Sequence, residues 1–279
     1  MAFTERVHAF IAARFHTRLI ETFGERGRKA FVHGTQYYAE QRGRRMAQRA
    51  IRDGMELTYE TYLQYGEWVN SKDTIEGECS NQATVQSTTP DYVNHITRCP
   101  WHAQFEEMGL RAAGMAYCWV LDSAISQGFN PELGYVVEQT LHTHDFCIHR
   151  LTTGPINEGS DRGKNPAGLR DFAYHCAHSY WAYAEVSKAI FGAEGEKITF
   201  NFQNDRLGYF GPAVSHDLKE WNWLNSGDES SFTYRFGEDE SKVYFAHSLL
   251  YHPARFSALC ERLGLEEKEL CKSRAGSWY

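Results

Sequence analysis

Two stretches of the chain share one pattern of phenylalanine and glycine, 168 residues apart. Residues 23–43 and 191–211 align without a gap, with identities at Phe23/Phe191, Gly24/Gly192, Gly27/Gly195, Lys29/Lys197 and Gly43/Gly211. A weaker similarity between the two halves follows. The dipeptide Cys99-Pro100 corresponds to His252-Pro253, and Gly109-Leu110 corresponds to Gly264-Leu265. Such self-similarity predicts an α+β protein of two similar halves, each made of helices packed on a short antiparallel sheet and related by a pseudo-twofold duplication.

The two halves differ in what they carry. We expect residues 1–151 to form a helical α+β half with a cluster of cysteine, aspartate and histidine side chains. Residues 169–279 are expected to form a degenerate second α+β half, because they contain no counterpart of Asp122 or of the histidine-rich segment 142–149. Residues 152–168 are rich in Gly, Pro, Ser and Asn, which is typical of an interdomain linker or of a flap over a site.

Hydrophobic periodicity predicts helices at the start of the chain and a β-hairpin after them. Apolar residues keep to one face of a helix over residues 5–22, and further helices are expected up to Gly54 and over residues 57–69. Residues 83–88 and 91–99 are β-rich and are separated by a turn signal, which predicts a hairpin. A mostly apolar helix over residues 114–126 follows.

Composition excludes several classes of partner. A net charge of −7 argues against nucleic-acid binding, because phosphate neutralisation needs clustered Lys and Arg. We interpret the basic run at residues 42–52 as a solvated helix face paired with nearby acids rather than as an anion site. No segment approaches the roughly 20 apolar residues of a membrane span, and no secretory signal is apparent. Seven scattered cysteines, an odd number, predict reduced thiols in a cytoplasmic protein.

The segment from Cys99 to Arg150 concentrates the residues that can do chemistry. Cys118 and Asp122 are four residues apart in the expected helix, so both would lie on one face. Residues 140–150 predict either a strand, with His142 and His144 facing one side, or a tight hairpin, which would undo that argument. A thiol needs a base or a positive partner to react near neutral pH, and either histidine could supply it. The candidate catalytic residues are therefore Cys118, Asp122, His142 and His144.

Each of these residues also has a purely structural interpretation. A buried cysteine in an apolar helix is usually inert packing, and single histidines are common at surfaces and caps. Cys99, Cys118 and Cys147 with one histidine would satisfy the preference of zinc for nitrogen and sulfur ligands. Their spacing matches no compact zinc motif, so neither a metal nor another cofactor is expected. The sequence also lacks a P-loop, GxSxG or GxGxxG at a strand-to-helix junction, which argues against nucleotide-dependent and serine-hydrolase chemistry.

Several short motifs of the first half carry a family resemblance. They are FGERG with YYAEQRG, Arg98-Cys99-Pro100, Tyr117-Cys118 with Asp122, Gly128-Phe129-Asn130-Pro131, and His144-Asp145-Phe146-Cys147. Over about half of its length the chain resembles the L-2-amino-thiazoline-4-carboxylic acid hydrolase family. The resemblance implies ring-opening hydrolysis of a cyclic amidine, at a carbon–nitrogen bond that is not a peptide bond. The candidate substrate-binding residues are Cys99, Cys147, Tyr117 and Asp145.

Two departures from the family bear on the substrate. His144 stands where the family pattern tends to have Gly, and the second half is not part of the usual family member. The closing strand is also similar to the 4-vinyl reductase domain, a small-molecule-binding module.

The expected function is a hydrolase that opens a small cyclic amidine or a related C–N ring by thiol and acid–base chemistry. A non-catalytic, sensor-like binding protein and a lyase or isomerase remain the alternatives. The expected partner is a small-molecule substrate, with no nucleic acid and no membrane, and self-association into a homo-oligomer is left open.

Overall fold

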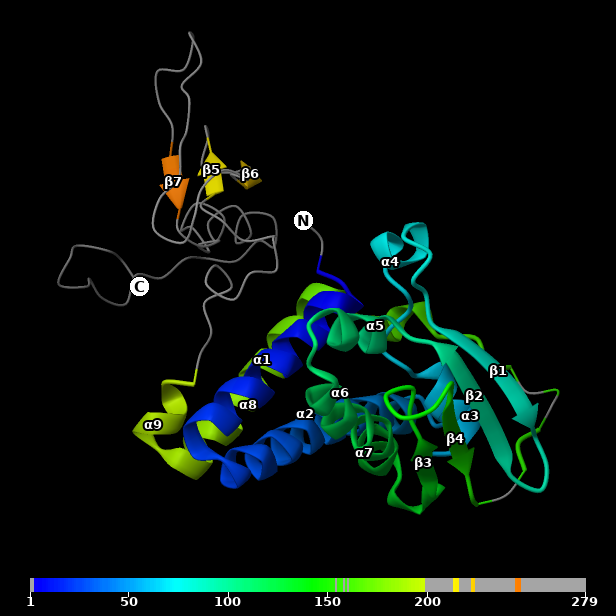
Figure 1. The fold of residues 1–279 in the computed structure, drawn as a ribbon. Helices are drawn as coiled ribbons and strands as arrows, with labels where there is room; N and C mark the ends of the chain where they lie inside the picture. The colour runs from blue at the N-terminus through cyan, green and yellow to red at the C-terminus, as the bar shows by residue number, and fades with distance from the viewer. Residues whose placement is uncertain are drawn as a thin grey trace, which may run out of the picture. The chain divides into compact units, whose positions relative to one another are not determined.

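The computed structural model describes residues 3–198, apart from 154, 158 and 160, together with three short strands further along the chain. The chain forms two compact units, Met1–Thr199 and Phe200–Tyr279. The first unit combines helices with a four-stranded antiparallel sheet (Figure 1). In the second, β5 (Ala213–Ser215) pairs antiparallel with β6 (Asn222–Trp223) and with β7 (Tyr244–Ala246). The prediction of mixed helix and antiparallel sheet is confirmed.

Two long helices open the chain. α1 (Glu5–Phe23) begins after Thr4, whose side chain accepts a hydrogen bond from the Val7 amide at 3.4 Å. It ends at Gly24, where a φ of 57° turns the chain into α2 (Glu25–Arg52). Both helices lie close to their expected positions. Among the described residues, no helix is long and apolar enough to cross a membrane.

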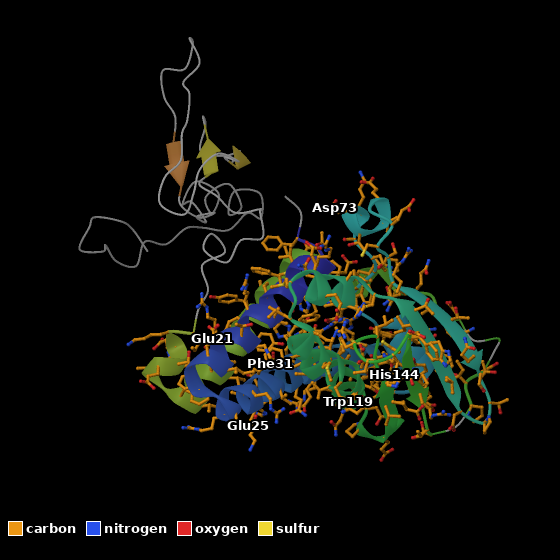
Figure 2. The ribbon with its side chains drawn as sticks, in the orientation of Figure 1. Glu21, Glu25, Phe31, Asp73, Trp119 and His144 are labelled. Carbon is orange, nitrogen blue, oxygen red and sulfur yellow. The ribbon has the colours of Figure 1, made fainter. Side chains whose placement is uncertain are left out.

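A third long helix, α8 (Phe172–Phe191), packs against both α1 and α2. Its Tyr183 ring stacks on Phe15 and Phe31, with centroids 5.1 and 5.2 Å away, and its hydroxyl lies 2.8 Å from Thr35 Oγ1. Figure 2 shows Phe31 among these helices. The three helices therefore share one aromatic core.

α8 ends as α1 does. Gly192 follows it with φ 61° and ψ −137°, close to the 57° and −133° of Gly24, and leads into α9 (Ala193–Glu196). The rings of Phe23 and Phe191 stack on each other with centroids 3.7 Å apart. The two aligned Phe-Gly turns thus have the same local geometry. Most of the second copy lies outside the described residues, so the duplication as a whole stays a prediction.

The sheet of the first unit is antiparallel, in the order β1-β2-β4-β3. Its strands are β1 (Gln82–Ser87), β2 (Tyr92–Arg98), β3 (Tyr135–Gln139) and β4 (Cys147–Leu151). β1 and β2 form the predicted hairpin, and β4 pairs with both β2 and β3. Alternate residues of β4, namely Cys147, His149 and Leu151, are buried. One face of this strand therefore points into the protein.

Several short elements connect the long helices and the sheet (Figure 1). They are α3 (Tyr59–Gln64), α4 (Lys72–Glu76), α5 (Pro100–Glu107), α6 (Arg111–Cys118) and α7 (Leu121–Phe129), with the 3-10 turns η1 (Pro131–Leu133) and η2 (Pro166–Gly168). The prediction of one helix over residues 114–126 is wrong, because the chain breaks between α6 and α7. The β-branched Val120 has φ −114°, and its amide bonds to the Tyr117 carbonyl in a tighter i→i+3 turn.

The described residues of the segment 152–168 pack on neighbouring elements. The Asn165 amide donates to the Gln64 carbonyl at 2.8 Å, and the Ile156 amide donates to the Thr88 carbonyl at 3.1 Å. These bonds tie the segment to α3 and to the turn of the first hairpin. Its role as a linker or a flap, and the division of the chain into halves on either side of it, stay predictions.

Candidate functional site

Three elements bring a carboxylate, a thiol and an imidazole together. α5 has Pro100 at its first position, where a missing amide hydrogen costs nothing. From that start His102 and Glu106 lie four residues apart, on one face of the helix. α6 ends at Cys118. The turn after β3 carries His142, which is buried.

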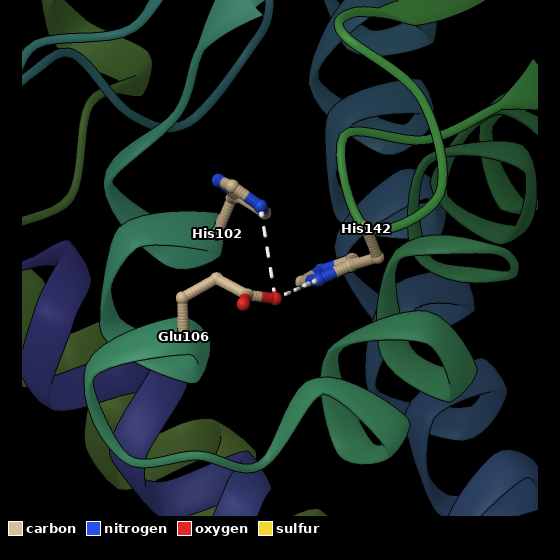
Figure 3. A group of neighbouring side chains, drawn as sticks. All are labelled: His102, Glu106 and His142. Atoms are coloured by element: carbon tan, nitrogen blue, oxygen red, sulfur yellow. Dashed lines mark hydrogen bonds and ion pairs between the residues drawn. The ribbon is translucent and has the colours of Figure 1, made fainter.

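His142 contacts the other two groups through its two ring nitrogens. Its Nε2 lies 3.5 Å from Cys118 Sγ. Its Nδ1 lies 3.4 Å from Glu106 Oε1, as Figure 3 shows. Arg111 holds Glu106 in turn, donating to both carboxylate oxygens at distances from 2.8 to 3.2 Å. Thiol, imidazole and carboxylate thus form a series within contact distance. This is the arrangement of a nucleophile, its base and the group that orients the base.

Gly114 makes room for the imidazole. It lies one turn before Cys118 on α6, and a Cβ atom at this position would collide with the His142 ring. On its other side the ring packs edge-on against Phe105 of α5, with centroids 5.8 Å apart. The imidazole is therefore fixed between α5 and α6.

The Cys118 thiol is protonated in the resting protein. Burial raises its pKa well above the ordinary value, and Cys99, Asp122 and Cys147 add to the effect. Burial also raises the pKa of Cys99 to about 12. Attack by the Cys118 sulfur therefore requires a base that accepts the proton as the new bond forms.

His142 is suited to be that base. Burial, together with the nearby His102 ring, lowers its pKa below 6.5, so the ring is neutral at physiological pH. The hydrogen bond from Arg111 lowers the pKa of Glu106 to about 2, so the carboxylate is ionised. A carboxylate facing Nδ1 favours the tautomer with its proton there, which leaves the lone pair of Nε2 facing Cys118.

Asp122 lies near the same thiol, in the first turn of α7. After the larger effect of burial, its charge raises the pKa values of Tyr59, Tyr62 and Tyr135. No donor in the described part of the chain forms a hydrogen bond with its carboxylate. A carboxylate without a hydrogen-bond donor among the described residues is available to a cationic ligand.

Five of the eight candidate residues come together. They are Cys118, Asp122, His142, Cys99 and Cys147. Cys147 Sγ also accepts a hydrogen bond from the Leu141 amide at 3.3 Å, which ties the turn that carries His142 to β4. This turn takes the hairpin form, because β3 ends at Gln139 and β4 begins at Cys147.

The other three candidates are His144, Asp145 and Tyr117. His144, labelled in Figure 2, and Asp145 are exposed. The His144 ring forms a hydrogen bond with the neighbouring Thr143 at 2.8 Å. Tyr117 is buried, and its hydroxyl lies 3.2 Å from Nδ1 of His8 on α1. The structure therefore does not bring His144 and Asp145 to Cys118. Tyr117 precedes Cys118 in α6 and interacts with it electrostatically, but its hydroxyl faces His8.

Sequence reasoning missed His102, Glu106 and Arg111. A signal for the first two exists, because a histidine and a glutamate at i and i+4 follow a Cys-Pro helix start. The sequence patterns predict only one helix after Pro100, the one that carries Cys118, and so leave this spacing without an interpretation. His102, Glu106 and His142 also form a group whose possible metal-ligand atoms lie within 4.8 Å of one another. This group differs from the set of Cys99, Cys118, Cys147 and one histidine, whose spacing in the sequence matches no compact zinc motif.

The basic run at residues 42–52 is only partly a solvated face. Its outer arginines pair with surface acids, as expected. Arg45 and Arg49 instead contact the buried Glu67 at 3.0 Å, and the buried Arg42 lies 3.7 Å from it. Burial alone would raise the pKa of Glu67, but these three guanidinium groups hold it below its ordinary value. The cluster fastens α2 to the loop between α3 and α4.

The mixed helix-and-sheet frame brings a thiol, an imidazole and a carboxylate together, a combination that also occurs in the active sites of hydrolases. The chain matches the family model of L-2-amino-thiazoline-4-carboxylic acid hydrolase over residues 4–148. It therefore belongs to this family, whose name is that of a hydrolase of the thiazoline carboxylate type. No curated protein and no solved structure matches the chain.

Proposed function

We propose that the protein opens a small cyclic amidine, of the thiazoline carboxylate type, by thiol-dependent hydrolysis. The observation that carries this proposal is the series Cys118–His142–Glu106, joined at 3.5 and 3.4 Å. The family match supports a hydrolase of that type. The five cysteines in the described residues are free, which suits a thiol enzyme in a cytoplasmic setting that acts on a small molecule.

Asp122 and Arg42 are the proposed partners of the substrate. A cyclic amidine is cationic when protonated, and Asp122 would pair with that cation and make the ring carbon more electrophilic. The substrate carboxylate needs a cation, and the buried Arg42 forms no hydrogen bond through its Nε among the described residues, where that atom lies 3.7 Å from Glu67 Oε2. After the larger effect of burial, the charge of Asp122 raises the pKa of Tyr62 and that of Arg42 lowers it, which supports a binding site that both residues reach.

The chemistry runs in two stages that use His142 twice. In the first, the Cys118 sulfur bonds to the amidine carbon while the thiol proton passes to His142 Nε2. The ring C–N bond then breaks, and the departing nitrogen takes the proton from His142. In the second, His142 takes a proton from water as the oxygen attacks the same carbon. The C–S bond breaks, Cys118 regains its proton, and one water has been added to the ring-opened product.

The test compares Cys118→Ala with Cys79→Ala, the same change at a cysteine outside the site. Cyclic amidines, thiazolines and lactams form the first substrate panel. We expect Cys118→Ala to lower kcat by about 10²–10⁴ or more, as expected for the loss of a nucleophile, while Cys79→Ala keeps wild-type turnover. Intact-mass spectrometry of the wild type with slow substrates should detect an adduct on Cys118.

Three results would contradict the proposal in different ways. Full activity of Cys118→Ala would remove sulfur as the nucleophile and leave an attacking water with Asp122 as the acid. Ring isomerisation or elimination without uptake of ¹⁸O from labelled water would identify a lyase or isomerase. Tight binding of an aromatic ligand without turnover of any ring would favour the sensor-like protein.

A further inference from the structure

Two imidazoles and a carboxylate converge beside Cys118. His102 Nε2 lies 3.8 Å from Glu106 Oε1, and His142 Nδ1 lies 3.4 Å from the same oxygen. The three possible ligand atoms all fall within 4.8 Å of one another (Figure 3). A tetrahedral ion with bonds of about 2.0–2.1 Å holds its ligands roughly 3.3 Å apart, so small side-chain movements would close this triangle around an ion.

The donor set suits a transition metal. Imidazole nitrogen and carboxylate oxygen are ligands that zinc-class ions accept, and three protein ligands leave further positions open. His102 and Glu106 share one face of α5, while His142 comes from the turn before β4. The group therefore joins two separate elements, as a site formed by folding does.

The surroundings of these ligands resemble the outer shell of a metal site. The His102 ring is hydrogen-bonded to the backbone of Leu141, and the Nε2 of His142 faces Cys118. Metal-binding histidines usually have their second nitrogen fixed in this way. Arg111 contacts both oxygens of Glu106, but its side chain is 63% exposed. The Arg111 side chain can therefore give up its hydrogen bond to Glu106 Oε1 in favour of water and keep the bond to Oε2.

We propose that His102, Glu106 and His142 bind a divalent transition-metal ion of the zinc class, and that this ion switches off the thiol site. A neutral imidazole has one free lone pair. When the lone pair of His142 is on Nδ1 and binds the metal, Nε2 carries the proton and cannot accept one from Cys118. The metal and the thiol therefore compete for one histidine. The switching rests on the proposed hydrolase function, whereas the binding does not.

Binding is tested first, on chelator-treated full-length protein titrated with Co²⁺. We expect one equivalent to bind and to produce visible d–d bands of low-symmetry Co²⁺, without a thiolate charge-transfer band. His102→Ala and Glu106→Gln should each weaken binding by about 100-fold or more, beyond the 10–100-fold typical of outer-shell changes. The exposed His33→Ala is the matched control and should bind as the wild type does. Unaltered binding in both site variants, or a charge-transfer band lost in Cys118→Ser, would overturn the site.

Inhibition is tested second, with the ratio of each protein's turnover in Zn²⁺ to its own turnover in chelator. We expect the ratio to fall at least 10-fold for the wild type and for His33→Ala, and to stay near one for His102→Ala. A rise in wild-type turnover with Zn²⁺ would overturn the switch even if Co²⁺ binds. Absence of turnover in every condition, with Co²⁺ bound, would contradict the hydrolase and leave the metal site standing.

Discussion

At the scale of single residues, the position of His142 decides what the site can do. Glu106 and Cys118 approach its two nitrogens, and Gly114 provides the space for its ring. The side chain has little freedom, because it is packed between two helices and lies in a turn tied to β4 through Cys147. Such confinement keeps a base aligned with its nucleophile, and small displacements lower rates steeply.

Gly114→Ala is expected to lower turnover by at least about 10-fold, because the added methyl group displaces the imidazole from Cys118. The change should appear in kcat with little effect on KM, since Gly114 only positions the base. Steady-state kinetics and a thermal melt measure the two effects separately. An unchanged kcat would show that the ring does not need its present position.

Asp122→Asn is expected to lower kcat/KM for protonated cyclic amidines by at least about 10-fold, because an amide lacks the charge that pairs with the cation. Neutral lactams of similar shape should lose much less. The comparison is a ratio of kcat/KM values within one variant, so a general loss of folded protein cancels. Equal losses for both substrate types would contradict the pairing.

The choice between His142 and His144 as the proposed base is also tested at this scale. His142→Gln should lower kcat by about 10²-fold or more, because the general base is lost. His144→Gln changes an exposed side chain two residues away, where the geometry offers no contact with Cys118. A larger loss in His144→Gln would return the catalytic role to the residue that departs from the family pattern.

At the scale of secondary-structure elements, the cluster around Glu67 joins α2 to the chain after α3. Arg42, Arg45 and Arg49 are successive along one side of α2, and all three meet this one buried carboxylate. Removing one member of a buried ionic group is costly, because the remaining charges stay buried without compensation. The cluster therefore contributes more to this junction than the exposed pairs on the same helix.

Glu67→Gln is expected to lower the free energy of unfolding by about 3–5 kcal/mol, the usual cost of breaking a buried ion pair. Glu40→Gln breaks the exposed pair with Arg44 and should cost less than about 1 kcal/mol. Urea denaturation of both variants gives the comparison. Equal costs would mean that the buried arginines find other partners.

The sequence predicts elements better than it predicts the site. The periodicity of α1 and the turn signal of the first hairpin are local properties, so they survive folding unchanged. Cys118 and Asp122 were expected on one helix, but the break at Val120 depends on how α6 and α7 pack on α1 and α2. The approach of Glu106 to His142 spans 36 residues of chain, and no local pattern encodes it.

At the scale of the whole molecule, the helical layer contains histidines that burial keeps neutral. Burial and the charge of Arg28 lower the pKa of His16 to about 4, and burial with the charge of Arg42 lowers that of His175 to about 3. The unfolded chain binds these protons near pH 6.5, whereas the folded chain does not. Their contribution to stability is therefore complete above pH 6.5 and is lost as the pH falls toward 4 for His16 and toward 3 for His175.

The free energy of unfolding should decrease between pH 7 and pH 5, with a slope of up to about 1.4 kcal/mol per pH unit for each buried histidine. His16→Gln should flatten this slope, while the exposed His33→Gln should leave it unchanged. Denaturant titrations at several pH values measure the slopes. A slope that is the same in all three proteins would exclude His16 as a source of the pH dependence.

The protonated state of Cys118 has a consequence for the survival of the protein in an oxidising cell. Peroxides react with thiolates far faster than with thiols, so a sulfur that is ionised at rest is gradually converted to sulfenic and higher acids. Burial keeps the Cys118 sulfur protonated until the proposed reaction transfers its proton to His142. The proposed nucleophile is therefore protected from oxidants for as long as its proton stays on the sulfur.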